Sequence, residues 1–114
     1  MHMQVFIKDE LIAEVDFDPI QQTVGEYKTY SKDVVWLPFG VCMNPDYGFV
    51  ESFLESRCPP RERVNIKELL HNWGLDFYDP LAIVQKTYGR MLADYLWVKF
   101  DDDPVTYQDV KIRD

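Results

Sequence analysis

The chain has 114 residues, an apolar fraction of 46% and a formal net charge of −8, from 12 Lys and Arg against 20 Asp and Glu. The length fits one domain over residues 1–114, and the apolar content, which includes seven Phe, seven Tyr and three Trp, excludes a wholly disordered chain. The negative charge disfavours nucleic acid or an anionic membrane as the main partner, because phosphate groups would be repelled.

The first 40 residues are predicted to be mainly β. Two short runs of alternating apolar residues, 4–8 and 11–17, flank a charged turn, which predicts an antiparallel hairpin that ends at Asp18-Pro19. Residues 20–33 are polar and are expected to form a loop, with an irregular strand left open. The β-branched and aromatic run 34–37 predicts a short strand that enters the core.

The middle of the chain, residues 46–89, is predicted to be helical because its apolar residues recur at helical spacing. We expect three helices, over about 47–57, 61–73 and 80–89. Asp46 is the expected N-cap of the first helix, and Gly74 is expected in the left-handed conformation that ends the second. Asp79 and Pro80 are the expected cap and first residue of the third.

The last part of the chain, residues 92–114, is predicted to hold a strand over 95–100 and then an arm. The arm, over 105–114, alternates only weakly, and both a loosely held strand and an ordered arm stay open. Taken together, the pattern predicts an α+β fold with N-terminal antiparallel strands, three central helices and a returning C-terminal strand.

The sequence has no residue pattern typical of a catalytic site, a phosphate-binding loop or a metal site. The five glycines are isolated, so no phosphate-binding loop can be built, and two histidines offer no zinc site. The run Asp101–Asp103 lacks the ligand spacing of a calcium loop and is interpreted as a solvated turn. We therefore predict no catalytic residue, no cofactor and no metal, and a protein-binding function.

The two cysteines, Cys42 and Cys58, form no CxxC pair, and such sparse use is typical of reduced thiols in a cytosol. The N-terminus lacks the pattern of a signal peptide, and no apolar run approaches the length of a membrane span. We therefore expect a cytoplasmic protein.

Several aromatic residues are candidates for an exposed apolar patch, which is the usual mark of a protein interface. Half-buried strands must turn one of two neighbouring aromatic side chains outward. The candidates on this ground are Phe39, Tyr95, Trp97 and Tyr107.

Four short motifs between residues 34 and 100 carry a resemblance to a known family. In chain order they are Leu37-Pro38-x-Gly40, Leu54-x-x-Arg57-x-x-Pro60-x-x-Arg63, Leu70-x-x-x-Gly74-Leu75 and Leu92-x-Asp94-x-x-Trp97-Val98. Their order and spacing resemble the N-terminal region found ahead of HipA-like serine/threonine kinases. The kinase core of that family has no counterpart in this sequence.

The resemblance implies that the chain is similar to a separately encoded N-terminal subdomain, which in toxin–antitoxin systems of this kind binds the kinase and restrains it. On this view the exposed aromatic patch would be the face that packs on the kinase. Three arginines near the second helix, Arg57, Arg61 and Arg63, are candidates for pairing with carboxylates of the partner.

Two other classes of function stay open from the sequence. One is an acidic phage or mobile-element protein that inhibits a nucleic-acid-binding enzyme, although the carboxylates are dispersed along the chain. The other is a small enzyme that uses carboxylates or Cys58, for which no paired motif exists. A homo-oligomer, the identity of the partner, and whether the chain inhibits or completes a kinase are left open as well.

Overall fold

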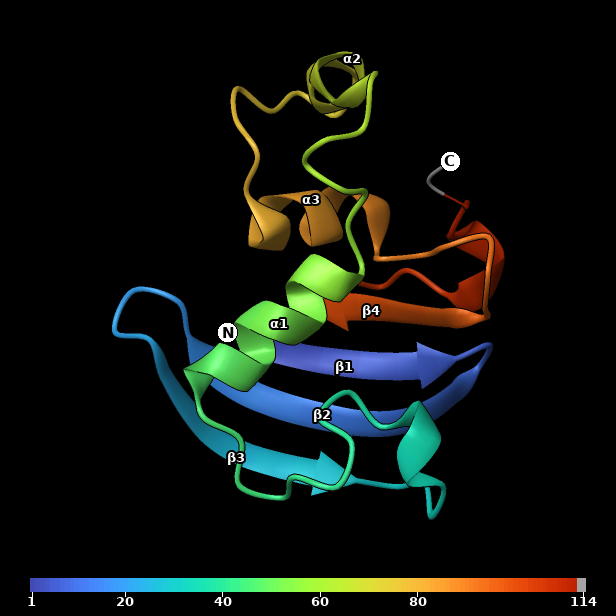
Figure 1. Cartoon of the computed structure of the whole chain (residues 1–114). Helices are drawn as coiled ribbons and strands as arrows, with labels where there is room; N and C mark the ends of the chain where they lie inside the picture. Colours follow the sequence, from blue (N-terminus) through green and yellow to red (C-terminus); the bar gives the residue numbers. More distant parts are fainter. Residues whose placement is uncertain (113–114) are drawn as a thin grey trace.

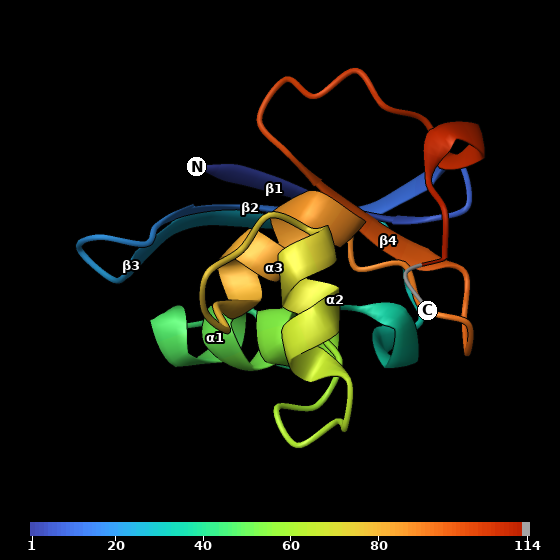
Figure 2. The same cartoon turned by 90° about the horizontal axis from the view of Figure 1, so that it is seen from above.

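Four antiparallel strands form one sheet, and the three α-helices lie on one of its faces (Figure 1, Figure 2). The computed structural model describes residues 1–112. The sheet order is β3-β2-β1-β4, with β1 over His2–Ile7, β2 over Glu10–Asp18, β3 over Thr23–Thr29 and β4 over Leu96–Phe100. The α+β class that the sequence predicts is confirmed.

The face of the sheet under the helices is apolar. Val5 of β1 is fully buried, and it lies beside Ala13 of β2 and Val98 of β4. Because side chains alternate along a strand, Phe6 and its neighbour Trp97 lie on the opposite face, where their rings stack with centroids 4.6 Å apart. The sheet therefore buries apolar side chains on both faces near β1 and β4.

Helix α1 (Tyr47–Ser56) and helix α3 (Pro80–Thr87) cover the sheet, whereas α2 (Ile66–Asn72) stands further from it (Figure 1). The side chain of Asp46 accepts a hydrogen bond from the Phe49 N–H, as the sequence predicts for an N-cap. The buried side chains of these two helices include Val50, Leu54, Ile83 and Val84.

Residues 23–36 differ from the prediction. The polar segment, for which a loop was expected and an irregular strand left open, forms β3. This strand needs few apolar residues because all of its side chains are exposed or half-buried. The predicted strand over 34–37 is wrong, since Val34–Trp36 form a 3-10 helix (η1) without a buried residue. The Asp33 carboxylate accepts a hydrogen bond from the Val35 N–H and caps this turn, so the chain coils as it leaves the sheet.

The second helix is shorter than predicted. Residues before Ile66 form turns, in which the Arg63 N–H donates to the Pro60 carbonyl oxygen and the Ile66 N–H to the Arg63 carbonyl oxygen. Val64, which was expected on the apolar face, is fully exposed. Gly74 has φ +74, so its predicted left-handed conformation at the end of the helix is confirmed.

The C-terminal arm runs beside β4 and forms no strand over residues 101–112, apart from a 3-10 turn at Tyr107–Asp109 (η2). Its contacts with the sheet and with α3 include two side-chain hydrogen bonds. The Lys99 ammonium donates to the Val105 carbonyl oxygen, and the Tyr88 hydroxyl donates to the Asp103 carboxylate. Residues 113–114 of the predicted arm lie outside the described residues.

Replacing the N-cap of α1 by alanine should destabilise the fold. Asp46→Ala removes the acceptor for the Phe49 N–H, and we expect a loss of about 1 kcal/mol in the free energy of unfolding. Urea denaturation of the variant and of wild type measures the difference. Asp102→Ala, which removes an exposed carboxylate from the turn after β4, is the matched control, and equal losses in both variants would contradict the capping role.

Candidate functional site

A groove of about 940 Å³ lies at the end of the sheet where the β1–β2 turn, η1 and the segment before β4 meet. Its place can be found in Figure 1 at the arrowhead end of β1, between the teal turn of η1 and the orange segment that leads into β4. Ile7, Ile12 and Leu96 line it with aliphatic side chains. Trp36 and Tyr95 line it as well and remain 46% and 54% exposed, so the groove has aromatic walls that are accessible to a partner.

The β1–β2 turn forms the charged side of the groove. The Lys8 ammonium lies 4.6 Å from the centroid of the Tyr95 ring, and the Lys8 N–H donates to the Tyr95 carbonyl oxygen. The Trp97 indole N–H donates to the Lys8 carbonyl oxygen over 2.6 Å. The turn is thereby fixed against β4, and the exposed carboxylates of Asp9 and Glu10 stand beside it.

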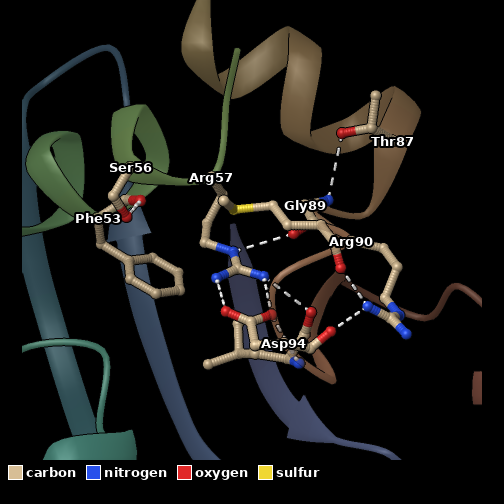
Figure 3. Close-up of polar contacts among 9 residues, drawn as sticks. Phe53, Ser56, Arg57, Thr87, Gly89, Arg90 and Asp94 are labelled. Atoms are coloured by element: carbon tan, nitrogen blue, oxygen red, sulfur yellow. Dashed lines mark hydrogen bonds and ion pairs between the residues drawn. The ribbon is translucent and has the colours of Figure 1, made fainter. Parts of the chain in front are cut away.

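A buried arginine holds two of the residues that line the groove, Asp94 and Leu96. Arg57, the residue after α1, is 6% exposed and makes a bidentate ion pair with Asp94, at 2.9 Å from Nη1 to Oδ2 and 2.8 Å from Nη2 to Oδ1 (Figure 3). Its remaining donors reach the backbone, Nε to the Gly89 carbonyl oxygen and Nη2 to the Leu96 carbonyl oxygen, each over 2.9 Å. Arg57 thus joins α1, the end of α3 and the start of β4.

The electrostatics of this pair favour an ionised Asp94. The hydrogen bonds from Arg57 lower the pKa of the Asp94 carboxyl, and burial opposes this effect. The Leu96 N–H also donates to Asp94 and lowers the pKa further. Position 89 requires glycine, because its backbone has φ +60 and an added Cβ would lie 3.1 Å from the Cβ of Arg57.

A second buried arginine connects the groove to the C-terminal arm. Arg90 donates to the carbonyl oxygens of Met91 and Asp94, and so holds the segment that leads into β4. Its guanidinium carbon lies 5.5 Å from the ring centroid of Tyr95 and 5.9 Å from that of Tyr107. Tyr95 in the groove wall and Tyr107 in the arm therefore share one cation.

The predicted interface residues fall into four groups, of which the first two lie in or next to the groove. Tyr95 lines the groove, and Tyr107 lies near it on the arm, half-buried. Arg57 and Trp97 are buried at 6% and 1% exposure, and each donates hydrogen bonds to residues that line the groove. Their side chains are used inside the chain, so neither presents a surface for a partner.

Phe39 is the clearest correction. Its predicted exposure is wrong, since the side chain is 5% exposed and its ring centroid lies 4.9 Å from that of Tyr27. Phe53 of α1 also contacts it edge-on, so Phe39 fills the space between β3 and α1. The sequence could not reveal this position, because residues 37–46 cross the sheet as a loop with no periodic pattern.

Arg61 and Arg63 lie outside the groove, in the turns that precede α2. The Arg61 guanidinium is exposed and lies 4.3 Å from the centroid of the Tyr78 ring, while Arg63 is half-buried. Their role at an interface stays a prediction.

Sequence reasoning missed Trp36 as a groove residue because it expected a buried strand there. Beside it Val35 is 77% exposed, and Leu92, in the segment that leads into β4, is 73% exposed. The available signal was Asp33 followed by Pro38, since an aspartate that caps a turn and a nearby proline together disfavour a central strand.

Residues 1–112 hold no metal site or membrane span that could serve as another kind of site. No three His, Cys, Asp or Glu side chains converge there as metal ligands. Cys42 and Cys58 form no disulfide, and Cys58 is buried. Over the same residues, no helix has the length and apolar character needed to cross a bilayer.

Comparisons of the chain with protein-family models, with curated proteins and with solved structures found no match. The function of the chain is therefore inferred from the groove and from the motif resemblance.

Breaking the buried ion pair should destabilise the chain and change its pH dependence. Asp94→Asn leaves the Arg57 charge without a counter-ion, and we expect a loss of about 3 kcal/mol in the free energy of unfolding near neutral pH. Because the pKa of Asp94 is lowered in the folded state, its contribution is present above the unfolded pKa of about 3.9 and is lost as the pH falls through the lower folded value.

The measurement is urea denaturation at a series of pH values between neutral and strongly acidic. Wild type should lose stability below about pH 4 more steeply than Asp94→Asn. Asp102→Asn, which neutralises an exposed carboxylate, should follow wild type. A variant Asp94→Asn as stable as wild type at neutral pH would show that the ion pair does not hold the fold.

Proposed function

We propose that the chain is a cytoplasmic, non-enzymatic protein-interaction module that binds and regulates a HipA-like kinase of the toxin–antitoxin type. The observation that carries the proposal is the groove with Trp36 and Tyr95 exposed on its walls. Trp and Tyr are the residues that contribute most often to binding energy at protein interfaces, and they are costly to leave in water without a partner.

The surroundings of the groove support a protein as the ligand. Val35 and Leu92, which precede the groove residues Trp36 and Ala93 in sequence, are exposed apolar side chains, at 77% and 73%. The walls are also fixed in advance, because Arg57 and Arg90 hold the segment that carries Tyr95. A preformed surface loses little conformational entropy on binding, which favours affinity.

The kinase as partner is supported by the motif resemblance. Two of the four motifs, distant in sequence, meet beside the groove, and a third begins directly after a groove residue. Trp36 directly precedes the first motif, Arg57 belongs to the second, and Asp94 belongs to the last. Asp94 of the last motif thus lines the groove, and Arg57 of the second motif holds it there.

The test is co-expression of the tagged chain with a HipA-like kinase from the same genome, followed by affinity capture and calorimetric titration. Trp36→Ala should weaken the complex by about 2 kcal/mol, or roughly thirtyfold in Kd, since a large aromatic anchor is lost from an interface. Tyr95→Ala should weaken it in the same direction.

Phe77→Ala is the matched control, because Phe77 is also an exposed aromatic residue, at 69%, and does not line the groove. Equal affinities of Trp36→Ala and Phe77→Ala would argue against the groove as the binding site. Capture of a nuclease or a polymerase from native cells, without a kinase, would favour the acidic inhibitor over the kinase regulator.

A further inference from the structure

Other segments of the chain cover one edge of the sheet, and the opposite edge is open. At the β4 edge, the Val98 N–H donates to the Tyr88 carbonyl oxygen over 2.8 Å, and Arg57 donates to the Leu96 carbonyl oxygen. Strand β3 forms the other edge, and among residues 1–112 no strand but β2 pairs with it. An open edge of seven residues without proline is a template for another strand.

The register shows which backbone groups of β3 point away from the sheet. Lys28 lies opposite Glu14, and the Tyr30 N–H donates to the Ile12 carbonyl oxygen. In an antiparallel sheet, each residue directs its N–H and its C=O to the same neighbouring strand, and successive residues alternate between the two sides of the strand. The groups of Lys28 and Tyr30 therefore face β2, and those of Tyr27 and Thr29 face outward.

The side chains of β3 are complementary to a second copy of the same strand. When two β3 strands lie antiparallel with Tyr27 opposite Tyr27, Glu26 of each copy faces Lys28 of the other. These two residues share the face away from the helices, where Glu26 Oε1 and Lys28 Nζ lie 3.0 Å apart within the chain. Cross-strand pairs of opposite charge stabilise a sheet.

Neighbouring registers are disfavoured by the same charges. A shift of the centre to Glu26 places the two Glu26 side chains opposite each other, and a shift to Lys28 does the same for the two lysines. Like charges that face each other across strands destabilise the pairing. The pattern Glu26-Tyr27-Lys28 thus favours the arrangement centred on Tyr27 over both of these neighbours.

We propose that the chain forms a symmetric homodimer in which two β3 strands pair antiparallel about Tyr27 and join the two sheets into one. Each copy uses the same surface, as an isologous two-fold interface requires. The proposal does not depend on the kinase as partner.

The experiment is sedimentation equilibrium over a concentration series, with the full chain at physiological ionic strength. Wild type should dimerise. Glu26→Lys and Lys28→Glu should each weaken the dimer by about tenfold or more, because both cross-strand pairs then carry like charges. Both side chains are exposed, so circular dichroism should show that the variants fold.

Mixing the two variants gives the decisive readout. In an equimolar mixture, Lys at positions 26 and 28 of one chain faces Glu at both positions of the other, and heterodimers should form with near wild-type affinity. The double reversal Glu26→Lys, Lys28→Glu should also restore the homodimer. Glu62→Lys and Lys67→Glu make the same charge changes away from β3 and should dimerise as wild type does.

Hydrogen exchange supplies an independent check. The amide protons of Tyr27 and Thr29 face outward and should exchange more slowly in the dimer than in the diluted chain. A wild-type monomer at every concentration, or single reversals that dimerise like the controls, would overturn the proposal. So would a monomeric chain whose Tyr27 and Thr29 amides become protected only when the kinase is added, because the edge would then belong to that partner.

Discussion

The rest of the structure depends on the hydrogen bonds and the ion pair of one buried side chain, the guanidinium of Arg57. It joins three segments that are distant in sequence, namely α1, the residues after α3 and the start of β4. Removing an arginine from water is costly, and the cost is offset here because a carboxylate and two carbonyl oxygens receive its donors. Since β4 completes the sheet beside β1, the position of the last strand and the position of α1 are coupled through one side chain.

The groove follows from this constraint. The ion pair with Asp94 and the carbonyl contacts of Arg90 fix the segment before β4, and that segment presents Tyr95 to solvent. The β1–β2 turn meets the same tyrosine through Lys8, and η1 supplies Trp36 from the other side. The exposed surface is therefore shaped by a buried polar cluster, so changes inside the chain would act on binding as well as on stability.

The two proposals place different demands on the molecule. The groove is a recessed surface with aromatic walls, which suits side chains of a foreign partner. The β3 edge offers backbone groups and an alternating charge pattern, which suits another strand. Covering β4 with Tyr88 and the C-terminal arm while leaving β3 open restricts strand addition to one side of the sheet.

The sequence by itself determined the α+β class, the hairpin, the helix that Asp46 caps, the helix that begins at Pro80 and the last strand, because each has a periodic pattern or a local cap. It also supplied Arg57, Tyr95 and Trp97 as residues of interest, without their roles. Only the tertiary structure decided that Arg57 and Trp97 are internal and that Tyr95 lines a groove. The tertiary structure also decided that Phe39 is buried against Tyr27 and that Trp36, in the turn η1, is exposed. The physical reason is that burial depends on contacts between distant segments, and no local pattern in the chain records them.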